Sequence, residues 1–554
     1  MTVTAATGST LSQLAERSWE RLGQESVQIF EGTTWTSAQL GARSRRFAAG
    51  LLAAGLRPGD RVVVCMANCP EVGVAYHGIW WAGGVTTPVL FLLSDAEIAH
   101  ILRDSGATFV ITTPEFLPKI QSAATGIETV RGIIVAGEPP TAETPAARPA
   151  TPSTATPSTA TPPTAATATA ATAAAAPGAA LGGAKAVLGF AEMESGAEAP
   201  QATRLPSDLA GLLYTGGTTG RSKGVMLTHD AMSAAAYAMV HASGEDDDLR
   251  VALLPLPLSH IYGLTVSVMS VHAATPRTGV LMRWFDPVGW LKLAEQHKAQ
   301  VGAVVPSMLQ LIMAQPMEDY DLSSLRRVAS GGAPLPAQVA ADFKRRMPGI
   351  EVYEGYGCSE LAGGITSGKP DRQIPVGSVG VPMPNIEMQI VRPDGTPVSP
   401  GEDGEICARG PMMMSAYWNA PDETAHAIRD GWFHTGDIGH QDEDGNLFVV
   451  DRIKDLIIRD GFNVYPRDVE EAMLTHPDVA LCAVVGRPDP RRGEEVVAFV
   501  QLSPDATVTE DELVNYGKQK LAAVKYPRVV RIVDQIPLTS VGKLDRKALR
   551  KHVS

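Results

Sequence analysis

Apolar residues recur along most of the chain at the spacings expected of helices and strands in turn. Residues 38–54 repeat apolar positions every three to four residues and stop at Gly55, which predicts an amphipathic helix. Arg61–Met66 and Ala107–Thr112 are short apolar runs of the kind that form buried strands. Helices alternating with such strands predict an α/β fold with largely parallel sheets.

One apolar stretch, Val72–Ser94, contains no Asp, Glu, Lys or Arg and is long enough to cross a bilayer. It also contains Gly83-Gly84 and Pro88, which interrupt a membrane helix. We interpret it as a buried helix, a glycine turn and a buried strand. We therefore expect no transmembrane span.

Residues 138–186 consist mostly of Ala, Thr, Pro and Ser. A segment without large apolar side chains cannot offset the entropy cost of ordering, so we expect it to be disordered. Such a segment is typical of a domain linker. Because α/β patterning continues on both sides, we favour an insertion in a surface loop.

The chain of 554 residues is too long for one hydrophobic core. A unit of about 100 residues follows Asp451, a size typical of a small independent domain. We therefore expect an N-terminal domain over 1–450, which contains the insert, and a C-terminal domain over 451–554. The expected elements of the second domain are helices over Pro466–Leu474 and Glu510–Leu521 and strands over Val479–Val485 and Glu495–Leu502.

Charge and cysteine usage narrow the functional classes. The net charge of -13 and the lack of a basic stripe argue against nucleic acid as a partner. The five cysteines are scattered and form no CxxC pair, which favours reduced thiols in a cytoplasm over a zinc site or disulfides. The N-terminal residues lack the basic start and apolar core of a signal peptide.

The segment Tyr214–Gly224 concentrates glycine, threonine, serine and lysine between two apolar runs. The apolar runs predict two strands of a hairpin, with the polar segment as its loop. Glycines let backbone amides surround an anion, and Lys223 adds a positive charge, so the loop suits a polyphosphate. It is not a Walker A loop, since Lys223 lies between Ser222 and Gly224. A flexible surface turn is the alternative.

Four later clusters carry candidate chemistry, each with a plainer alternative. Glu360 ends a glycine-rich bend and suits a magnesium ion, or is an exposed turn residue. Asp437 follows a Thr-Gly turn and can accept hydrogen bonds from ribose hydroxyls, or caps a turn. Asp451-Arg452 is a candidate charged site, and a charged surface strand is its alternative. Lys543, on a glycine-containing loop, has a solvated terminal lysine as its alternative.

The order of these motifs, over roughly residues 30–550, resembles the class-I adenylate-forming superfamily, which includes acyl-CoA synthetases, adenylation domains of peptide synthetases and beetle luciferases. The resemblance implies a large N-terminal domain of α/β subdomains with a small β-barrel-like subdomain, followed by a small mobile C-terminal α/β domain. It also implies ATP, Mg²⁺ and coenzyme A as cofactors.

The resemblance assigns a role to each matching residue. The glycine-rich loop would hold the β- and γ-phosphates of ATP, although Gly217 stands where the family usually has serine. Glu360 would bind magnesium, Asp437 the ribose, and Arg452 the ribose and phosphate. The nucleotide-binding residues implied are Thr215, Gly216, Thr218, Thr219, Gly220, Lys223, Gly331, Gly332, Ala333, Tyr356, Gly357, Ser359, Asp437 and Arg452.

The family mechanism needs no general base, because a carboxylic acid is already ionised at neutral pH. The carboxylate attacks the α-phosphate, and Lys543 would be the catalytic lysine that neutralises the crowded oxygens. Coenzyme A then attacks the acyl-adenylate after the C-terminal domain rotates. Asp451 would be the hinge, and Gly461 would belong to the hairpin that moves toward the pantetheine.

The acid is expected to be apolar. His260 matches the family's histidine near the acyl entrance, although a core histidine is the alternative. The following residues, Ile261 and Tyr262, include no aspartate for a substrate amine, which disfavours an amino acid. We favour a medium- or long-chain fatty acid, with cinnamate- or benzoate-like acids second. The expected lining is Val305, Pro306, Met308, Gly331, Gly355, Ala362, Gly363 and Gly364, which is apolar or small.

The leading interpretation is an AMP-forming acid–CoA ligase in the cytoplasm. An acyl-AMP ligase that loads a carrier protein, a luciferase-like enzyme and an inactive nucleotide-binding scaffold are the alternatives. The resemblance also leaves open a homodimer. A lysine acetyltransferase acting on Lys543 is a further candidate partner.

Overall fold

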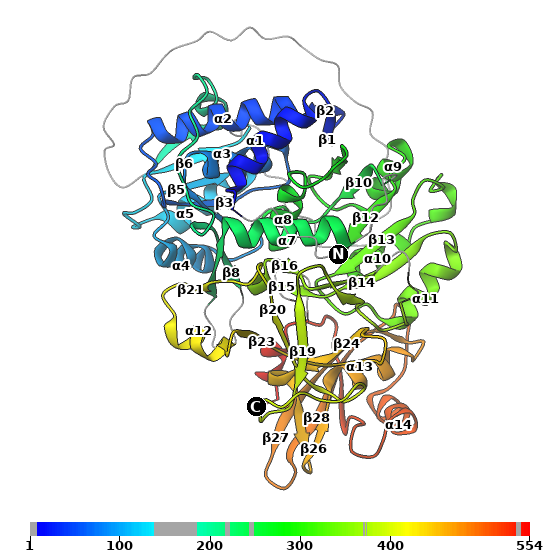
Figure 1. The fold of residues 1–554 in the computed structure, drawn as a ribbon. Helices are drawn as coiled ribbons and strands as arrows, with labels where there is room; N and C mark the ends of the chain where they lie inside the picture. The colour runs from blue at the N-terminus through cyan, green and yellow to red at the C-terminus, as the bar shows by residue number, and fades with distance from the viewer. Residues whose placement is uncertain are drawn as a thin grey trace.

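The computed structural model describes residues 8–137, 185–215, 222–242, 249–368, 372, 374–538 and 544–553. Figure 1 shows a large body formed by the earlier part of the chain and a smaller lobe formed by the last part. Strands β19, β20 and β23 lie between them (Figure 1). The mixed α/β architecture that the sequence predicts is confirmed.

The first sheet of the large body has eight strands in the order β21-β9-β8-β4-β3-β5-β6-β7. The strands from β8 to β7 run parallel, whereas β8, β9 and β21 pair antiparallel. Their bounds are β3 Arg61–Cys65, β4 Val85–Pro88, β5 Phe109–Thr112, β6 Gly132–Val135, β7 Ala186–Gly189, β8 Leu209–Thr215, β9 Lys223–Thr228 and β21 Ala416–Tyr417.

Helices cover both faces of this sheet because consecutive strand residues point to opposite sides. Val62 and Val64 pack in the same core cluster as Phe47 and Trp80, from α2 and α3. Val63 packs instead with residues of α4 and α5. The helices that accompany this sheet are α1 Leu11–Leu22, α2 Ser37–Ala53, α3 Pro70–Trp81, α4 Asp95–Ser105, η1 Pro114–Phe116, α5 Leu117–Ala124 and α6 Phe190–Met193.

The second sheet has seven strands in the order β14-β13-β12-β10-β11-β1-β2. All are parallel except β2, so the carboxyl ends of β10, β12, β13 and β14 meet at one edge. Its strands are β1 Ser26–Phe30, β2 Thr33–Thr36, β10 Val251–Leu254, β11 Thr278–Leu281, β12 Val301–Val304, β13 Arg327–Gly331 and β14 Glu351–Gly355. The helices that pack on this sheet are α9 Pro287–Gln296, α10 Pro306–Met313, η2 Met317–Asp319 and α11 Ala337–Arg346, whereas α7 His229–Ala242 and α8 Ile261–Met269 belong to the core cluster of the first sheet.

A five-stranded antiparallel sheet follows, in the order β19-β20-β23-β22 with β24 beside β23. It forms the subdomain between the large body and the last lobe (Figure 1). Its elements are β19 Glu387–Val391, β20 Gly404–Arg409, α12 Pro421–Ala427, β22 Ile428–Arg429, β23 Trp432–Gln441 and β24 Leu447–Arg452. Short hairpins precede it: β15 Gly357–Cys358 with β16 Gly363–Gly364, around η3 Ser359–Leu361, and β17 Thr366–Ser367 with β18 Val381–Pro382.

The C-terminal lobe is built on the sheet β26-β25-β28-β27, with β29 beside β28. The predicted helix over Pro466–Leu474 is confirmed with the same bounds, as α13. The elements of this lobe are η4 Ile453–Asp455, β25 Ile457–Arg459, β26 Phe462–Val464, α13 Pro466–Leu474, β27 Val479–Asp489, β28 Gly493–Leu502, α14 Glu510–Lys520, β29 Val529–Ile532 and α15 Arg546–Arg550.

The apolar stretch Val72–Ser94 folds as predicted, into most of the buried helix α3, a turn at Gly83 and the buried strand β4. Among the described residues, no helix combines the length and hydropathy that a membrane crossing requires. All five cysteines are free thiols, as the sequence led us to expect.

The low-complexity insert lies outside the described residues, except for Lys185 and Ala186. Ala186 begins β7, and β7 pairs in parallel with β6, the strand that precedes the insert. The insert therefore connects two neighbouring strands of one sheet. This position favours an insertion within a domain over a linker between domains.

Candidate active site

A central cleft runs between the large body, the five-stranded subdomain and the C-terminal lobe. Its walls include the carboxyl ends of β13 and β14, where ligands bind in open parallel sheets. The predicted site residues that line it are Thr215, Lys223, His260, Gly331, Gly332, Ala333, Tyr356, Gly357, Ser359, Glu360, Asp437, Asp451 and Arg452. Residues far apart in sequence therefore share one cleft.

The predicted glycine-rich hairpin is confirmed, because β8 and β9 pair antiparallel with Thr215 opposite Lys223. Lys223 Nζ lies 3.2 Å from the carboxylate of Glu423 and 4.9 Å from the ring centroid of Tyr417. This neighbourhood holds the lysine at the base of the loop. Gly216, Thr218, Thr219 and Gly220 lie outside the described residues, so their predicted contacts with phosphate stay predictions.

Asp437 is a buried carboxylate with two polar partners, Tyr356 and Arg452. The Tyr356 hydroxyl donates to Asp437 Oδ2 over 2.7 Å, and Arg452 Nε lies 3.0 Å from Oδ1. Burial and the charge of Asp437 raise the pKa of Tyr356 well above its ordinary value, so the phenol keeps its proton and donates it. Asp437 is 6% exposed, and its position beside the arginine and the tyrosine suits recognition of neighbouring hydroxyl groups.

Glu360 lies in η3, directly after the β15 strand. The hydroxyl of Tyr417 donates to Glu360 Oε1 over 2.8 Å, and the backbone N–H of Met414 donates to the Glu360 carbonyl. These bonds fix the carboxylate on the wall of the cleft. A carboxylate supplies the hard oxygen ligands that Mg²⁺ prefers, so Glu360 and the neighbouring Ser359 hydroxyl fit the predicted ion.

Two glycines of the site are required by geometry. A Cβ added at Gly357 would lie 2.0 Å from the carbonyl oxygen of Gly363, the partner strand of the β15–β16 hairpin. Gly332 has φ +80°, a conformation that L side chains rarely adopt. A side chain at Gly357 would therefore disrupt the β15–β16 hairpin that carries Glu360.

The acyl side of the cleft lies around the start of α8. His260 caps this helix, with Nδ1 accepting a hydrogen bond from the Tyr262 N–H over 3.4 Å. Of the predicted lining, all but one residue line the cleft, and the exception is Ala362. The prediction for Ala362 is wrong, because its left-handed backbone (φ 53°) places it fully buried in the core, where its carbonyl accepts from Thr265.

Asp451, the predicted hinge, is the second-to-last residue of β24 and is 8% exposed. Its Oδ1 accepts from the Arg452 N–H and its Oδ2 from the Arg467 N–H at the start of α13. Arg467 also donates to the Val449 carbonyl over 2.7 Å. The carboxylate thus ties the last strand of the subdomain to the first helix of the C-terminal lobe.

The predicted catalytic Lys543 lies outside the described residues. Its loop is bracketed by an antiparallel bridge between Leu538 and Leu544, and both leucines line the central cleft. Gly461 lies in the turn between β25 and β26, has φ +81°, and does not line the cleft. The residues flanking Lys543 therefore line the cleft, whereas Gly461 does not.

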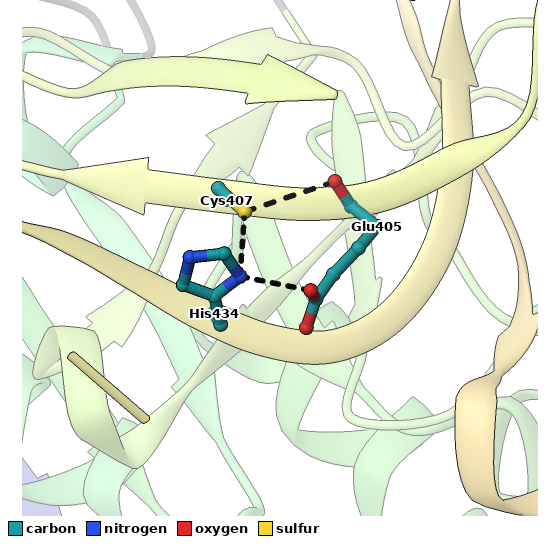
Figure 2. A group of neighbouring side chains, drawn as sticks. All are labelled: Glu405, Cys407 and His434. Atoms are coloured by element: carbon teal, nitrogen blue, oxygen red, sulfur yellow. Dashed lines mark hydrogen bonds and ion pairs between the residues drawn. The ribbon is translucent and has the colours of Figure 1, made fainter. Parts of the chain in front are cut away.

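Several residues at the cleft were missed by sequence reasoning. Glu354, at the end of β14, accepts from the Leu335 N–H, and burial raises the pKa of its carboxyl to about 7. Tyr417 supports Glu360. Glu405, Cys407 and His434 form a cluster (Figure 2), and Glu405 also accepts a hydrogen bond from the Gly436 N–H, next to Asp437. Glu354 directly precedes Gly355-Tyr356, so its place in this motif could have drawn attention to it. No local sequence pattern marks Tyr417, Glu405, Cys407 or His434, because their partners are distant in sequence.

Comparison with known proteins decides the family. Residues 15–418 match the family model of the AMP-binding enzyme, and residues 468–543 match the AMP-binding enzyme C-terminal domain. The chain belongs to the AMP-binding enzyme family. This enzyme is therefore a member of the class-I adenylate-forming superfamily, as its motifs predict.

Individual relatives cover almost the whole enzyme. It is 35% identical over 523 residues to a feruloyl-CoA synthase of Amycolatopsis sp, covering 94% of each chain. It is 32% identical over 547 residues to a long-chain-fatty-acid–CoA ligase of Bacillus subtilis, covering 98% of this chain and 94% of that one. Among solved structures, the amide bond synthetase McbA from Marinactinospora thermotolerans superposes with a TM-score of 0.81 at 28% identity, covering 99% and 100% of the two chains.

Proposed function

We propose that this enzyme is an AMP-forming acid–CoA ligase, which activates a carboxylic acid with ATP and transfers the acyl group to coenzyme A. One observation carries the proposal. Lys223, Glu360, Asp437 and Arg452 come from separate elements and line one cleft, which the leucines flanking the Lys543 loop also line. A magnesium nucleotide requires positive charge for its phosphates, a carboxylate for Mg²⁺ and a carboxylate that binds the ribose hydroxyls. Lys223 and Arg452, Glu360 and Asp437 supply these three kinds of group.

In the first half-reaction the substrate carboxylate attacks the α-phosphate, and pyrophosphate leaves. Asp437 would accept the ribose hydroxyls, with Arg452 beside it toward the phosphate. Glu360 and Ser359 would hold Mg²⁺, which supplies charge neutralisation to the phosphates when bound. Lys223 and Lys543 would add positive charge where negative charge develops.

In the second half-reaction the thiol of coenzyme A attacks the acyl carbon and AMP leaves. The hydrogen bonds of Asp451 support a role for it as the hinge, because its carboxylate accepts from backbone N–H groups of both the subdomain and α13. A rotation here would move the Lys543 loop away from the nucleotide and bring the Gly461 turn toward it. The domain boundary at residue 451 is part of this proposal.

The acid is proposed to have an apolar body. The acyl side of the cleft offers Val305, Met308 and the glycine hairpin Gly363-Gly364, and these groups suit hydrocarbon. Medium- and long-chain fatty acids are the first candidates. Aryl acids of the hydroxycinnamate type are the second, favoured by the 35% identity to a feruloyl-CoA synthase. Cytoplasmic location, a homodimer and acetylation of Lys543 stay predictions.

The test measures AMP release with a panel of fatty, hydroxycinnamic and benzoic acids, each with coenzyme A, with a carrier protein, with an amine or with no acceptor. The proposal expects acid-dependent AMP release that coenzyme A accelerates, with the acyl-CoA recovered as product. The Asp437→Ala variant is the matched control for the nucleotide site. Release stimulated only by the carrier protein or only by the amine would overturn the ligase proposal, and no release with any acid would overturn adenylation itself.

A further inference from the structure

Asp437 lies where β23 leaves regular pairing with β20, although on its other side it pairs with Arg452 of β24. On β20, Glu405 pairs with Ile438 and Cys407 pairs with His434, so only Ile406 stands opposite the three residues Thr435–Asp437 of β23. The strand therefore bulges outward there, and the bulge presents Asp437 to the cleft. The bulged residues lose ladder bonds toward β20, so side chains there help to satisfy the backbone groups.

Glu405 is one of the groups that hold this bulge. Its Oε1 accepts from the backbone N–H of Gly436, in the middle of the bulge, over 3.3 Å. The Thr435 hydroxyl donates to the Ile406 carbonyl over 2.8 Å, and the Asp437 N–H donates to that hydroxyl over 3.1 Å. Gly436 itself has φ +71°, so the turn relies on glycine as well as on these bonds.

Two further side chains fix the Glu405 carboxylate. Figure 2 shows His434, at the start of the bulge, directed toward Glu405 and Cys407. His434 Nδ1 lies 2.8 Å from Glu405 Oε2 and 3.2 Å from Cys407 Sγ. Arg429, from the neighbouring strand β22, lies 3.2 Å from the same carboxylate oxygen. Glu405 and His434 are mostly buried, with 18% and 13% of their side chains exposed.

A metal ion is the other use of Glu405, Cys407 and His434, whose ligand atoms lie within 4.8 Å of one another. The surroundings argue against it. Arg429 Nη2 lies 2.5 Å from His434 Nδ1, so a cation already occupies the position beside the carboxylate. Burial raises the pKa of the Cys407 thiol to about 12, which keeps it protonated rather than a thiolate ligand.

We propose that Glu405 is a positioning residue, which with His434 and Arg429 holds the bulge Thr435–Asp437 so that the Asp437 carboxylate faces the ribose. The inference rests on the proposed function, because it needs Asp437 to bind ribose hydroxyls. It goes beyond that function in assigning nucleotide selectivity to a residue that need not touch the nucleotide.

The test uses the ribose hydroxyls as the readout. The ratio of kcat/KM for ATP to that for 2′,3′-dideoxyATP reports how well the enzyme uses those hydroxyls. In the wild-type enzyme we expect a ratio of about tenfold or more, the usual contribution of hydrogen bonds to a charged group. Glu405→Ala is expected to reduce the ratio severalfold toward that of Asp437→Ala, with the KM for the acid unchanged.

Three variants make the test decisive. Glu405→Gln keeps an oxygen for the Gly436 N–H and should retain more of the ratio than Glu405→Ala. Arg429→Gln changes a half-exposed side chain, so it tests the same network if Glu405→Ala fails to fold. Glu387→Ala is the matched control, because Glu387 pairs with Arg409 on the same sheet at the surface and should leave the ratio unchanged.

The outcomes separate this inference from the proposed function. If Glu405→Ala, or Arg429→Gln in its place, lowers kcat/KM for both nucleotides by the same factor, the ratio is preserved and the positioning role is overturned. If the wild-type enzyme forms AMP but does not discriminate between the nucleotides, the ribose role of Asp437 falls, and this inference with it. If no AMP forms at all, the proposed function has failed first.

Discussion

Glu354 gives a prediction whose size follows from the structure. Its carboxyl is 9% exposed at the end of β14, and burial raises its pKa from 4.5 to about 7, partly opposed by the charge of Arg467. Glu354→Gln keeps the oxygen that accepts from the Leu335 N–H but removes the ionisation. Because only the ionised form is penalised by burial, the variant should differ from the wild type only where Glu354 would ionise.

The sign and the magnitude follow from proton linkage. Below pH 4.5 the carboxyl is protonated in both folded and unfolded chains, so Glu354→Gln and the wild type should have similar free energies of unfolding. As pH rises toward 7, only the unfolded chain loses the proton, and the wild type loses stability. The pKa difference of about 2.5, at about 1.4 kcal/mol for a difference of one, lowers the free energy of unfolding of the wild type by about 3.5 kcal/mol above pH 7.

The assay is the thermal midpoint of the large body between about pH 4.5 and pH 8. With about 2.1 cal/mol/K of unfolding entropy per residue, a domain of roughly 450 residues shifts by about 1 °C per kcal/mol. The midpoint of Glu354→Gln should therefore gain about 3 to 4 °C over the wild type as pH rises through this range. Glu351→Gln, an exposed position on the same strand, is the control and should show no such gain. A difference that stays constant with pH would refute the reasoning.

Three further predictions concern the cleft and its hinge. Asp437→Ala should raise the KM for ATP about tenfold or more, since a charged acceptor for ribose is lost, while leaving the KM for the acid unchanged in steady-state kinetics. Tyr417→Phe removes the hydroxyl that donates to Glu360, so the Mg²⁺ concentration for half-maximal activity should rise by about threefold to tenfold, and an unchanged Mg²⁺ titration would contradict the support role. Asp451→Pro should spare adenylate formation and slow thioester formation when the half-reactions are measured separately, whereas equal loss in both would count against a hinge at this position.

Much of the fold could be predicted from local patterns. The helix α13 and the strand β28 have the periodicity and end signals of isolated elements, so their bounds agree with the sequence to within two residues. The β8–β9 hairpin was equally clear, because apolar strands flank a loop of small polar residues. These features depend on residues close together in the chain, where the pattern contains the information.

The support of the site could not be predicted in the same way. The hydroxyl of Tyr417 reaches Glu360 across 57 positions, and His434 reaches Glu405 across 29. Such contacts arise from sheet pairing and packing, which a single sequence does not encode at any fixed spacing. Ala362 was misplaced for a local reason instead, since a left-handed turn after η3 turns it into the core.

The central claim is that separate elements of the chain converge on one nucleotide and that the C-terminal lobe supplies a cation to the reacting phosphate. Acid-dependent exchange of labelled pyrophosphate into ATP, measured without coenzyme A in the wild type and in Lys543→Ala, tests this most directly. We expect exchange in the wild type and its near-complete loss in the variant, although the variant should still convert added acyl-adenylate to acyl-CoA. Undiminished exchange in Lys543→Ala would contradict the account.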